Sequence, residues 1–195
     1  MLLAGVVLAV PAGAVTADFD TLESSASPTQ PADRIQNATP VAEPPPPSVA
    51  PESLQILALI NNVRASRGLV PMRLNVSLNA AAQSHSAAQA ATGTIFHIAP
   101  NGSNPGDRIA QTGYTFSTWG ENVAAGYRTA QTVMDAWMGS PGHCRNILNP
   151  GFTELGVGYV QREGDPSRFF DYWTQVFARP KGEPLPPGTY NAAWC

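Results

Sequence analysis

The sequence predicts an α+β fold in which helices pack on one central antiparallel sheet. Helix-like spacing of apolar residues dominates the first part of the folded region, and two strand-like segments, 154–161 and 169–178, follow near its end. This order along a chain is typical of helical layers against an antiparallel sheet. With 195 residues, 43% of them hydrophobic, the chain is long enough for one domain with its own core.

The first predicted helix begins at Glu52 and is ended by Gly68. Its apolar residues recur at steps of three and four positions: Ile56, Leu57, Ile60 and Val63. Glycine is the residue that most often follows the end of a helix. The folded domain is therefore expected to start near residue 53.

The second predicted helix is capped by Asn75 or Ser77 and ends at Gly93. Its apolar stripe is rich in alanine, which predicts close packing against a neighbouring element. His85 lies on the same stripe. A histidine in such a stripe is more often a hydrogen-bonded core residue than a ligand, so we interpret His85 as structural.

The region between residues 94 and 128 reads as a loop, interrupted by a short helix near 107–111. Long loops inside compact domains tend to carry function. A further helix is expected over 129–137, and a short helical turn over 144–148 follows the helix breakers Pro141 and Gly142. The two strands 154–161 and 169–178 are joined by a turn at 164–166.

The N-terminal region divides into two parts. Residues 1–17 combine an apolar run, too short to span a bilayer, with small residues that fit a cleavage site, and this pattern predicts a secretory signal peptide. Residues 18–52 are rich in Pro, Ser, Thr and Ala and contain few large apolar side chains, so they predict a disordered, partly polyproline spacer. We expect a secreted or periplasmic protein without a transmembrane anchor after cleavage.

The charge balance indicates neither nucleic acid nor an anionic membrane as a partner. The formal net charge is −3, from 11 basic and 14 acidic residues, and the basic residues form no run. The charge thus identifies no partner; the predicted export makes an extracellular ligand the expectation.

Six sequence blocks occur in an order that resembles the bacterial branch of the CAP superfamily, whose secreted SCP domain is shared by cysteine-rich secretory proteins, antigen 5 and plant pathogenesis-related 1 proteins. The blocks are Phe96-His97, Gly120-Glu121-Asn122-Val123, Ala136-Trp137 with Ser140-Pro141-Gly142-His143, Asn146-Ile147-Leu148, Phe152-Thr153-Glu154-Leu155-Gly156-Val157-Gly158, and Tyr172-Trp173-Thr174-Gln175-Val176-Phe177. The resemblance places a CAP domain at 53–180 and a tail at 181–195. It implies a three-layer α-β-α sandwich around the central antiparallel sheet.

The resemblance also implies a cleft of histidines and acidic residues that in some members holds a divalent metal such as zinc. His97 matches the first cleft histidine of the family, and Glu121 matches the glutamate of its Gly-Glu-Asn block. The sequence departs from the family at two other cleft positions, which are Ser140 and Tyr172 here rather than an acidic residue and a histidine. We expect His143 to replace the missing histidine and Glu154 to supply the second carboxylate.

Two histidines and one carboxylate could bind a metal and leave one position to water. His97, Glu121 and His143 are the predicted metal ligands, and Glu154 is the predicted general base if that water takes part in hydrolysis. A polar cleft network without metal explains the same residues, because no His-Glu-x-x-His helix fixes their geometry. Whether the protein is an enzyme therefore stays open, with binding favoured over turnover.

The two cysteines stand at positions 144 and 195. Cys144 follows His143 and could be read as a thiolate nucleophile. Export, together with one other cysteine at the C-terminus, favours instead a Cys144–Cys195 disulfide that holds the tail over the helix of the site.

The sequence thus predicts a secreted CAP-domain protein that acts as an extracellular binding or interaction module. The alternatives are a metal-dependent hydrolase of extracellular peptide or cell-wall material, a structural envelope protein, and a binder of lipid or sterol. Trp119, Trp137 and Trp173 would suit a core or an apolar cleft wall equally well.

Overall fold

The structure, a computed structural model, describes residues 50–195. The predicted signal peptide, 1–17, and nearly all of the predicted spacer, 18–52, lie outside the described residues. Helix α1 (Pro51–Ala65) starts slightly before the predicted boundary, because proline is favoured in the first helical turn, where its missing N–H costs nothing. Within the described part of the chain, no helix is both long and apolar enough to cross a bilayer.

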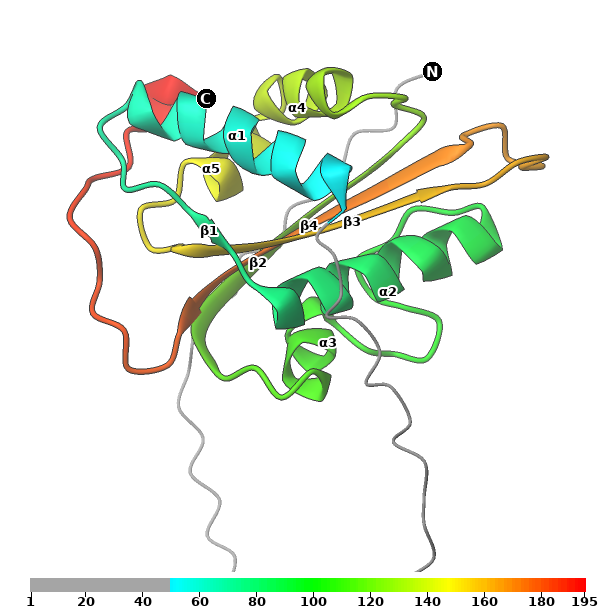
Figure 1. The fold of residues 1–195 in the computed structure, drawn as a ribbon, viewed down its shortest axis with the longest axis horizontal. Coiled ribbons are helices and arrows are strands. Elements are labelled where there is room, and N and C mark those ends of the chain that lie inside the picture. The colour runs from blue at the N-terminus through cyan, green and yellow to red at the C-terminus, as the bar shows by residue number, and fades with distance from the viewer. Residues whose placement is uncertain (1–49) are drawn as a thin grey trace, which may run out of the picture. The chain divides into compact units, whose positions relative to one another are not determined.

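A four-stranded sheet forms the middle layer of the domain (Figure 1). Its strands are β1 (Arg73–Leu74), β2 (Phe116–Ala125), β3 (Glu154–Gln161) and β4 (Asp171–Pro180), in the spatial order β1-β3-β4-β2. β4 pairs antiparallel with both β3 and β2, and β1 pairs parallel with β3. The predicted antiparallel sheet therefore holds for the three long strands, and the short β1 makes the complete sheet mixed.

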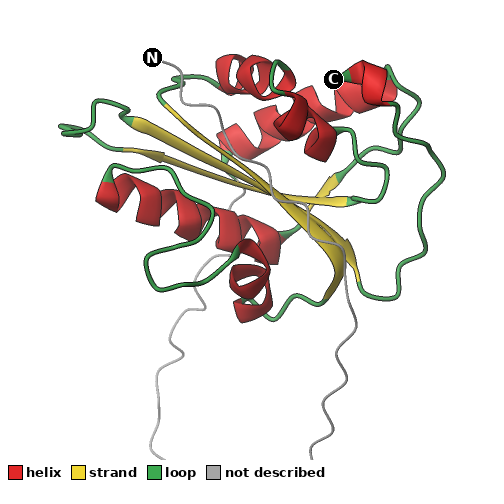
Figure 2. Ribbon diagram, turned by 180° about the vertical axis from the view of Figure 1, so that it is seen from behind, coloured by secondary structure: helices red, strands yellow, loops and turns green. Residues whose placement is uncertain are grey.

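Helices cover both faces of the sheet. One face carries α1, α4 (Ala130–Met138) and α5 (Pro141–Ile147), and the other carries α2 (Val76–Thr92) and α3 (Pro105–Gln111), as Figures 1 and 2 show from opposite sides. Separate apolar clusters fill the two spaces between helices and sheet. The predicted α+β class and its three α-β-α layers are confirmed.

Helix α2 lies with its backbone almost on β3. A Cβ atom added at Gly156 would stand 2.1 Å from the carbonyl carbon of Leu78, and one at Gly158 would stand 2.3 Å from that of Ala82. Ala81 and Ala82 are buried in this contact. The small residues on both partners permit this approach, as the alanine-rich stripe of α2 predicted.

The prediction of a loop over residues 94–128 was wrong for its second half, which contains β2. This strand has no apolar alternation because two consecutive polar residues, Glu121 and Asn122, are both buried, on opposite faces of the sheet. The predicted short helix is α3, two residues longer at its start. Its capping box joins Asn104 and Asp107 through hydrogen bonds in both directions.

The C-terminal tail returns from β4 to the helical layer that contains α1. Glu183 forms an ion pair with Arg73, and Cys195 forms a disulfide with Cys144, with Cα atoms 5.8 Å apart. Trp194, in a short 3-10 helix (Ala192–Trp194), packs against the main apolar cluster. The predicted disulfide is present, and it joins the tail to α5.

Arg64 is fully buried at the C-terminal end of α1 and has no carboxylate partner within residues 50–195. Its guanidinium donates hydrogen bonds to four carbonyl oxygens, those of Val70, Ile147, Asn149 and Phe152. Burial lowers the pKa of Arg64 to about 10. This side chain therefore ties α1 to the segment that joins α5 to β3.

Candidate functional site

The candidate site forms at the free edge of β2, the last strand in the sheet. Side chains of successive strand residues point to opposite faces of the sheet, so Glu121 and Asn122 face different helical layers. Glu121 contacts residues of α2, α3 and the loop between them, whereas Asn122 donates a hydrogen bond to the carbonyl of His143 in α5. β2 therefore carries residues that face both helical layers.

Glu121 is the centre of a buried charged cluster. Its side chain is 1% exposed; Oε2 accepts a hydrogen bond from Arg108 at 2.7 Å, and Oε1 accepts one from His97 Nδ1 at 2.8 Å. A buried carboxylate is stable only when paired, and Arg108 supplies that positive charge. Both carboxylate oxygens are therefore engaged within the protein.

His97 lies in the loop that follows α2, with its side chain 12% exposed. A carboxylate accepts hydrogen bonds, so the contact with Glu121 places the proton of the neutral ring on Nδ1. The other nitrogen, Nε2, then carries a lone pair, and it is buried without a hydrogen-bond partner in the part of the chain that the structure describes. This carboxylate–histidine arrangement is the one that orients metal-binding histidines in many proteins.

His143 lies in the first turn of α5 and is 5% exposed. Burial, followed by the charge that His97 can carry, lowers the pKa of His143 to about 4. His143 is thus neutral near pH 7. Its Nε2 is also buried, and no residue among 50–195 gives it a hydrogen bond.

A chain of buried amides holds α5 against β2. Asn146 donates to the carbonyl of Glu121 at 3.1 Å and to the side-chain oxygen of Asn122 at 2.9 Å. Asn122 donates in turn to the carbonyl of His143 at 3.2 Å and to Gln175 of β4 at 3.0 Å. The network fixes the backbone of His143 relative to that of Glu121.

The structure does not bring Glu154 together with this cluster. Glu154 starts β3, and β4 lies between β3 and β2, which separates the two strands by about 9.6 Å. Its carboxylate accepts hydrogen bonds from Tyr114 at 2.6 Å, Arg73 at 3.0 Å and Asn75 at 3.1 Å. Burial, followed by the contact with Glu154, raises the pKa of Tyr114. Glu154 thus belongs to a second network around β1 and the start of α2.

The two positions that depart from the family pattern lie outside the histidine cluster as well. Ser140 is the N-cap residue of α5 and makes no side-chain cap. Tyr172 donates its hydroxyl to Asp165 in the β3–β4 turn at 2.7 Å. Neither residue replaces a missing cleft ligand.

Arg108 is the residue of the site that sequence analysis missed. Arg108 lies inside the predicted short helix 107–111, but a single arginine in a short helix gives no signal of its own. The stretch Asn104-Pro105-Gly106-Asp107 carries the signal of a helix start, and a helix that begins there could have placed Arg108 on an inward face.

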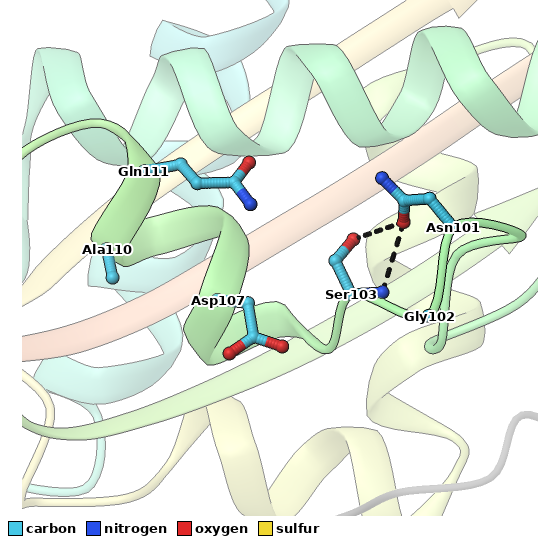
Figure 3. Close-up of a pocket in the computed structure, with 6 residues that line it drawn as sticks. All are labelled: Asn101, Gly102, Ser103, Asp107, Ala110 and Gln111. Carbon is cyan, nitrogen blue, oxygen red and sulfur yellow. Dashed lines mark hydrogen bonds between the residues drawn. The ribbon is translucent and has the colours of Figure 1, made fainter.

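An open surface depression lies between α3 and the turn that precedes it (Figure 3). Its lining is Asn101, Gly102, Ser103, Asp107, Ala110 and Gln111. Asn101 accepts hydrogen bonds from the backbone and hydroxyl of Ser103, which closes the turn. None of the three histidines lines this depression, so it is separate from the histidine cluster.

The site provides some, but not all, of the ligands that a metal ion requires. Within residues 50–195, no group of three or more His, Cys, Asp or Glu side chains is gathered as a metal site. Two buried imidazole nitrogens, on His97 and His143, nevertheless lack partners. Unpaired buried nitrogens are costly, and a metal is one group that would satisfy them. The protein thus offers two candidate ligands.

The α-β-α sandwich, with a buried Glu–His pair at its sheet edge and a histidine from the facing layer, defines an SCP-type domain. The chain belongs to the CAP family, the cysteine-rich secretory protein family, whose model matches residues 57–177. This match confirms the resemblance inferred from the six sequence blocks.

The chain is similar to a protein of Bacillus subtilis (strain 168), the uncharacterized protein YkwD. The two are 36% identical over 132 residues, which is 68% of this chain and 49% of YkwD. The chain thus spans about half the length of this curated relative.

Two solved structures share the fold. An extracellular protein containing a SCP domain from Bacillus anthracis str. Ames is 26% identical, with a TM-score of 0.58 over 69% of this chain and 45% of that one. An outer surface protein from Borrelia burgdorferi is 21% identical, with a TM-score of 0.59 over 65% of this chain and 90% of that one. The second likeness concerns the fold alone.

Proposed function

We propose that this protein is exported and acts as an extracellular binding module, with His97 and His143 as protein ligands of a divalent metal such as zinc. One observation carries the proposal: among residues 50–195, neither imidazole has a hydrogen-bond partner for its buried Nε2, and both residues contact β2, the edge strand. The extracellular setting is supported by the disulfide and by the Bacillus anthracis relative, which is an extracellular protein.

Glu121 is assigned to orient His97 rather than to bind the metal. Both of its oxygens already accept hydrogen bonds, from His97 and Arg108. Its charge keeps the proton of His97 on Nδ1 and the lone pair on Nε2. The sequence left the role of Glu121 as ligand or orienter open, and the geometry supports the second.

Two protein ligands leave coordination positions for water or for oxygen atoms of a bound molecule. A metal bound there would act as a Lewis acid toward such an oxygen. His97 and His143 hold the position, and Arg108 balances the charge of Glu121 behind it. We therefore expect metal-dependent recognition of a ligand that carries an anionic or carbonyl oxygen. A lipid, sterol or cell-wall component as that ligand stays a prediction.

The hydrolase alternative lacks a supporting observation. It needs a general base close to the metal-bound water, and the predicted base, Glu154, is held by Tyr114, Arg73 and Asn75 in another network. Binding is thus the function that the geometry supports best.

The test is zinc binding by the chelator-free protein, measured as metal content and by calorimetric titration near pH 7. Three proteins are compared: wild type, His143→Ala and the control Arg145→Ala, which changes an exposed residue of the same helix. We expect one metal per chain in wild type and control, and an affinity at least about 10- to 100-fold lower in His143→Ala. Circular dichroism checks that all three are folded.

Two results would overturn the proposal. One is a wild-type protein that takes up no zinc, and the other is a folded His143→Ala variant that binds zinc as tightly as wild type. Either would leave His97 and His143 as members of a polar network without metal.

A further inference from the structure

The third histidine of the chain, His85, lies directly behind the site. It is buried in α2, and its Nε2 is 2.8 Å from the carbonyl oxygen of Phe96 and 3.7 Å from Oε1 of Glu121. Phe96 is the residue immediately before His97. A contact to this carbonyl therefore acts on the backbone that carries the candidate ligand.

The contact determines the protonation state of His85. A carbonyl oxygen only accepts hydrogen bonds, so Nε2 must carry the proton. Nδ1 then carries no proton, and it is buried with no hydrogen-bond partner among the described residues. Burial lowers the pKa of His85, which agrees with a neutral ring.

A second residue of α2 holds the other backbone group of Phe96. Gln89, one helical turn after His85, accepts a hydrogen bond from the Phe96 N–H through Oε1 at 3.3 Å. Its own Nε2 donates to Thr174 of β4 at 3.2 Å. The edge of the Phe96 ring also packs against His85, with centroids 5.2 Å apart. Both backbone polar groups of Phe96, its N–H and its carbonyl, are thus fixed to α2.

The hydrogen bond to Phe96 favours a histidine at position 85, but it leaves Nδ1 of the same ring buried and unpaired among the described residues. A buried nitrogen without a partner lowers stability. Residues retained at such a cost often serve a site rather than the fold. At this position His85 can fix the loop that carries His97.

We propose that His85 is a positioning residue of the site. Through Phe96 it holds His97 so that Nδ1 stays on Glu121 and Nε2 remains available to a ligand. The inference rests on the proposed function for its effect on metal affinity, and its effect on the tautomer of His97 is independent of any metal.

The experiment compares wild type, His85→Leu and His85→Gln by nitrogen NMR of the histidine rings and by zinc titration. Glutamine can donate an N–H at about the reach of histidine, whereas leucine cannot. In metal-free His85→Leu we expect His97 to become a mixture of tautomers while the protein stays folded. Zinc affinity should fall about 10- to 100-fold, and His85→Gln should restore both properties.

The outcomes separate this inference from the proposed function. A folded His85→Leu protein in which His97 keeps its Nδ1–H tautomer overturns the role of His85, whatever zinc does. If neither wild type nor the two His85 variants bind zinc, but the tautomer of His97 changes as expected, the positioning role of His85 stands and the proposed metal site fails. If His85→Leu does not fold, the wild-type spectrum decides: His85 must carry its proton on Nε2, and a proton on Nδ1 refutes the inference.

Discussion

Removal of the disulfide gives a direct measure of how firmly the C-terminal tail holds the fold. Cys144 and Cys195 are 51 residues apart in sequence. For a loop of this length, the chain-entropy relation gives about 14 cal/mol/K, or about 4 kcal/mol at 25 °C. The tail adds contacts of its own, because Tyr190, Trp194 and Cys195 pack against the main apolar cluster. We therefore expect Cys195→Ser to lower the free energy of unfolding by about 4 kcal/mol.

The choice of Cys195 rather than Cys144 keeps the test clean. Cys144 is fully buried and is tolerated as a free thiol, whereas Cys195 is only partly buried at the chain end. Guanidinium unfolding of wild type and Cys195→Ser, with and without dithiothreitol, gives the assay. Reduction should bring wild type close to the variant and leave the variant unchanged. A difference below about 1 kcal/mol between oxidised wild type and Cys195→Ser would refute the assigned role of the bridge.

Two further predictions concern the sheet and its turn. Gly156→Ala places a methyl group 2.1 Å from the carbonyl carbon of Leu78, so we expect it to destabilise the protein by about 3 kcal/mol or more in chemical unfolding. The control Gly139→Ala, whose added methyl group has its nearest atom at 3.4 Å, should cost less than about 1 kcal/mol. Equal effects of the two substitutions would show that α2 shifts away from β3 to make room. Burial raises the pKa of Asp165, but hydrogen bonds from Tyr172 and Ser167 outweigh it and hold this pKa well below its ordinary range. The unfolded chain therefore binds the proton first, and the stability from this carboxylate is present above about pH 4 and lost as the pH falls through the folded-state pKa. Asp165→Asn should flatten the dependence of Tm on pH below about pH 4, and parallel profiles of the two proteins would contradict this.

Sequence analysis located the strands whose buried positions are occupied by apolar residues. β3 was predicted at 154–161 and found there, because its large apolar residues and the Gly156 and Gly158 positions make a regular pattern. β2 was missed because its central residues, Glu121 and Asn122, are polar and buried on both faces. A polar pair in sequence is usually solvated, and only its tertiary partners show that it is not.

The candidate site could be predicted only as far as the sequence blocks identify single residues. His97 and Glu121 are in contact, as the family resemblance implied, and His143 lies at the same edge. Glu154 was expected to join them, but its position depends on strand order, which places β4 between β3 and β2. Strand order depends on contacts far apart in the chain, so the spacing of motifs does not determine it.

The close approach of α2 to β3 has a consequence for motion. With Leu78 and Ala82 seated over Gly156 and Gly158, this helix can neither slide nor roll without lifting off the sheet. We therefore expect the half of the site that α2 supports to move little when a molecule binds. Adjustment is expected from α5, which is held by the buried amides on one side and by the Cys144–Cys195 disulfide on the other. Slow exchange broadening in NMR spectra should accordingly be confined to α5 and the tail, while the amides of α2 stay sharp.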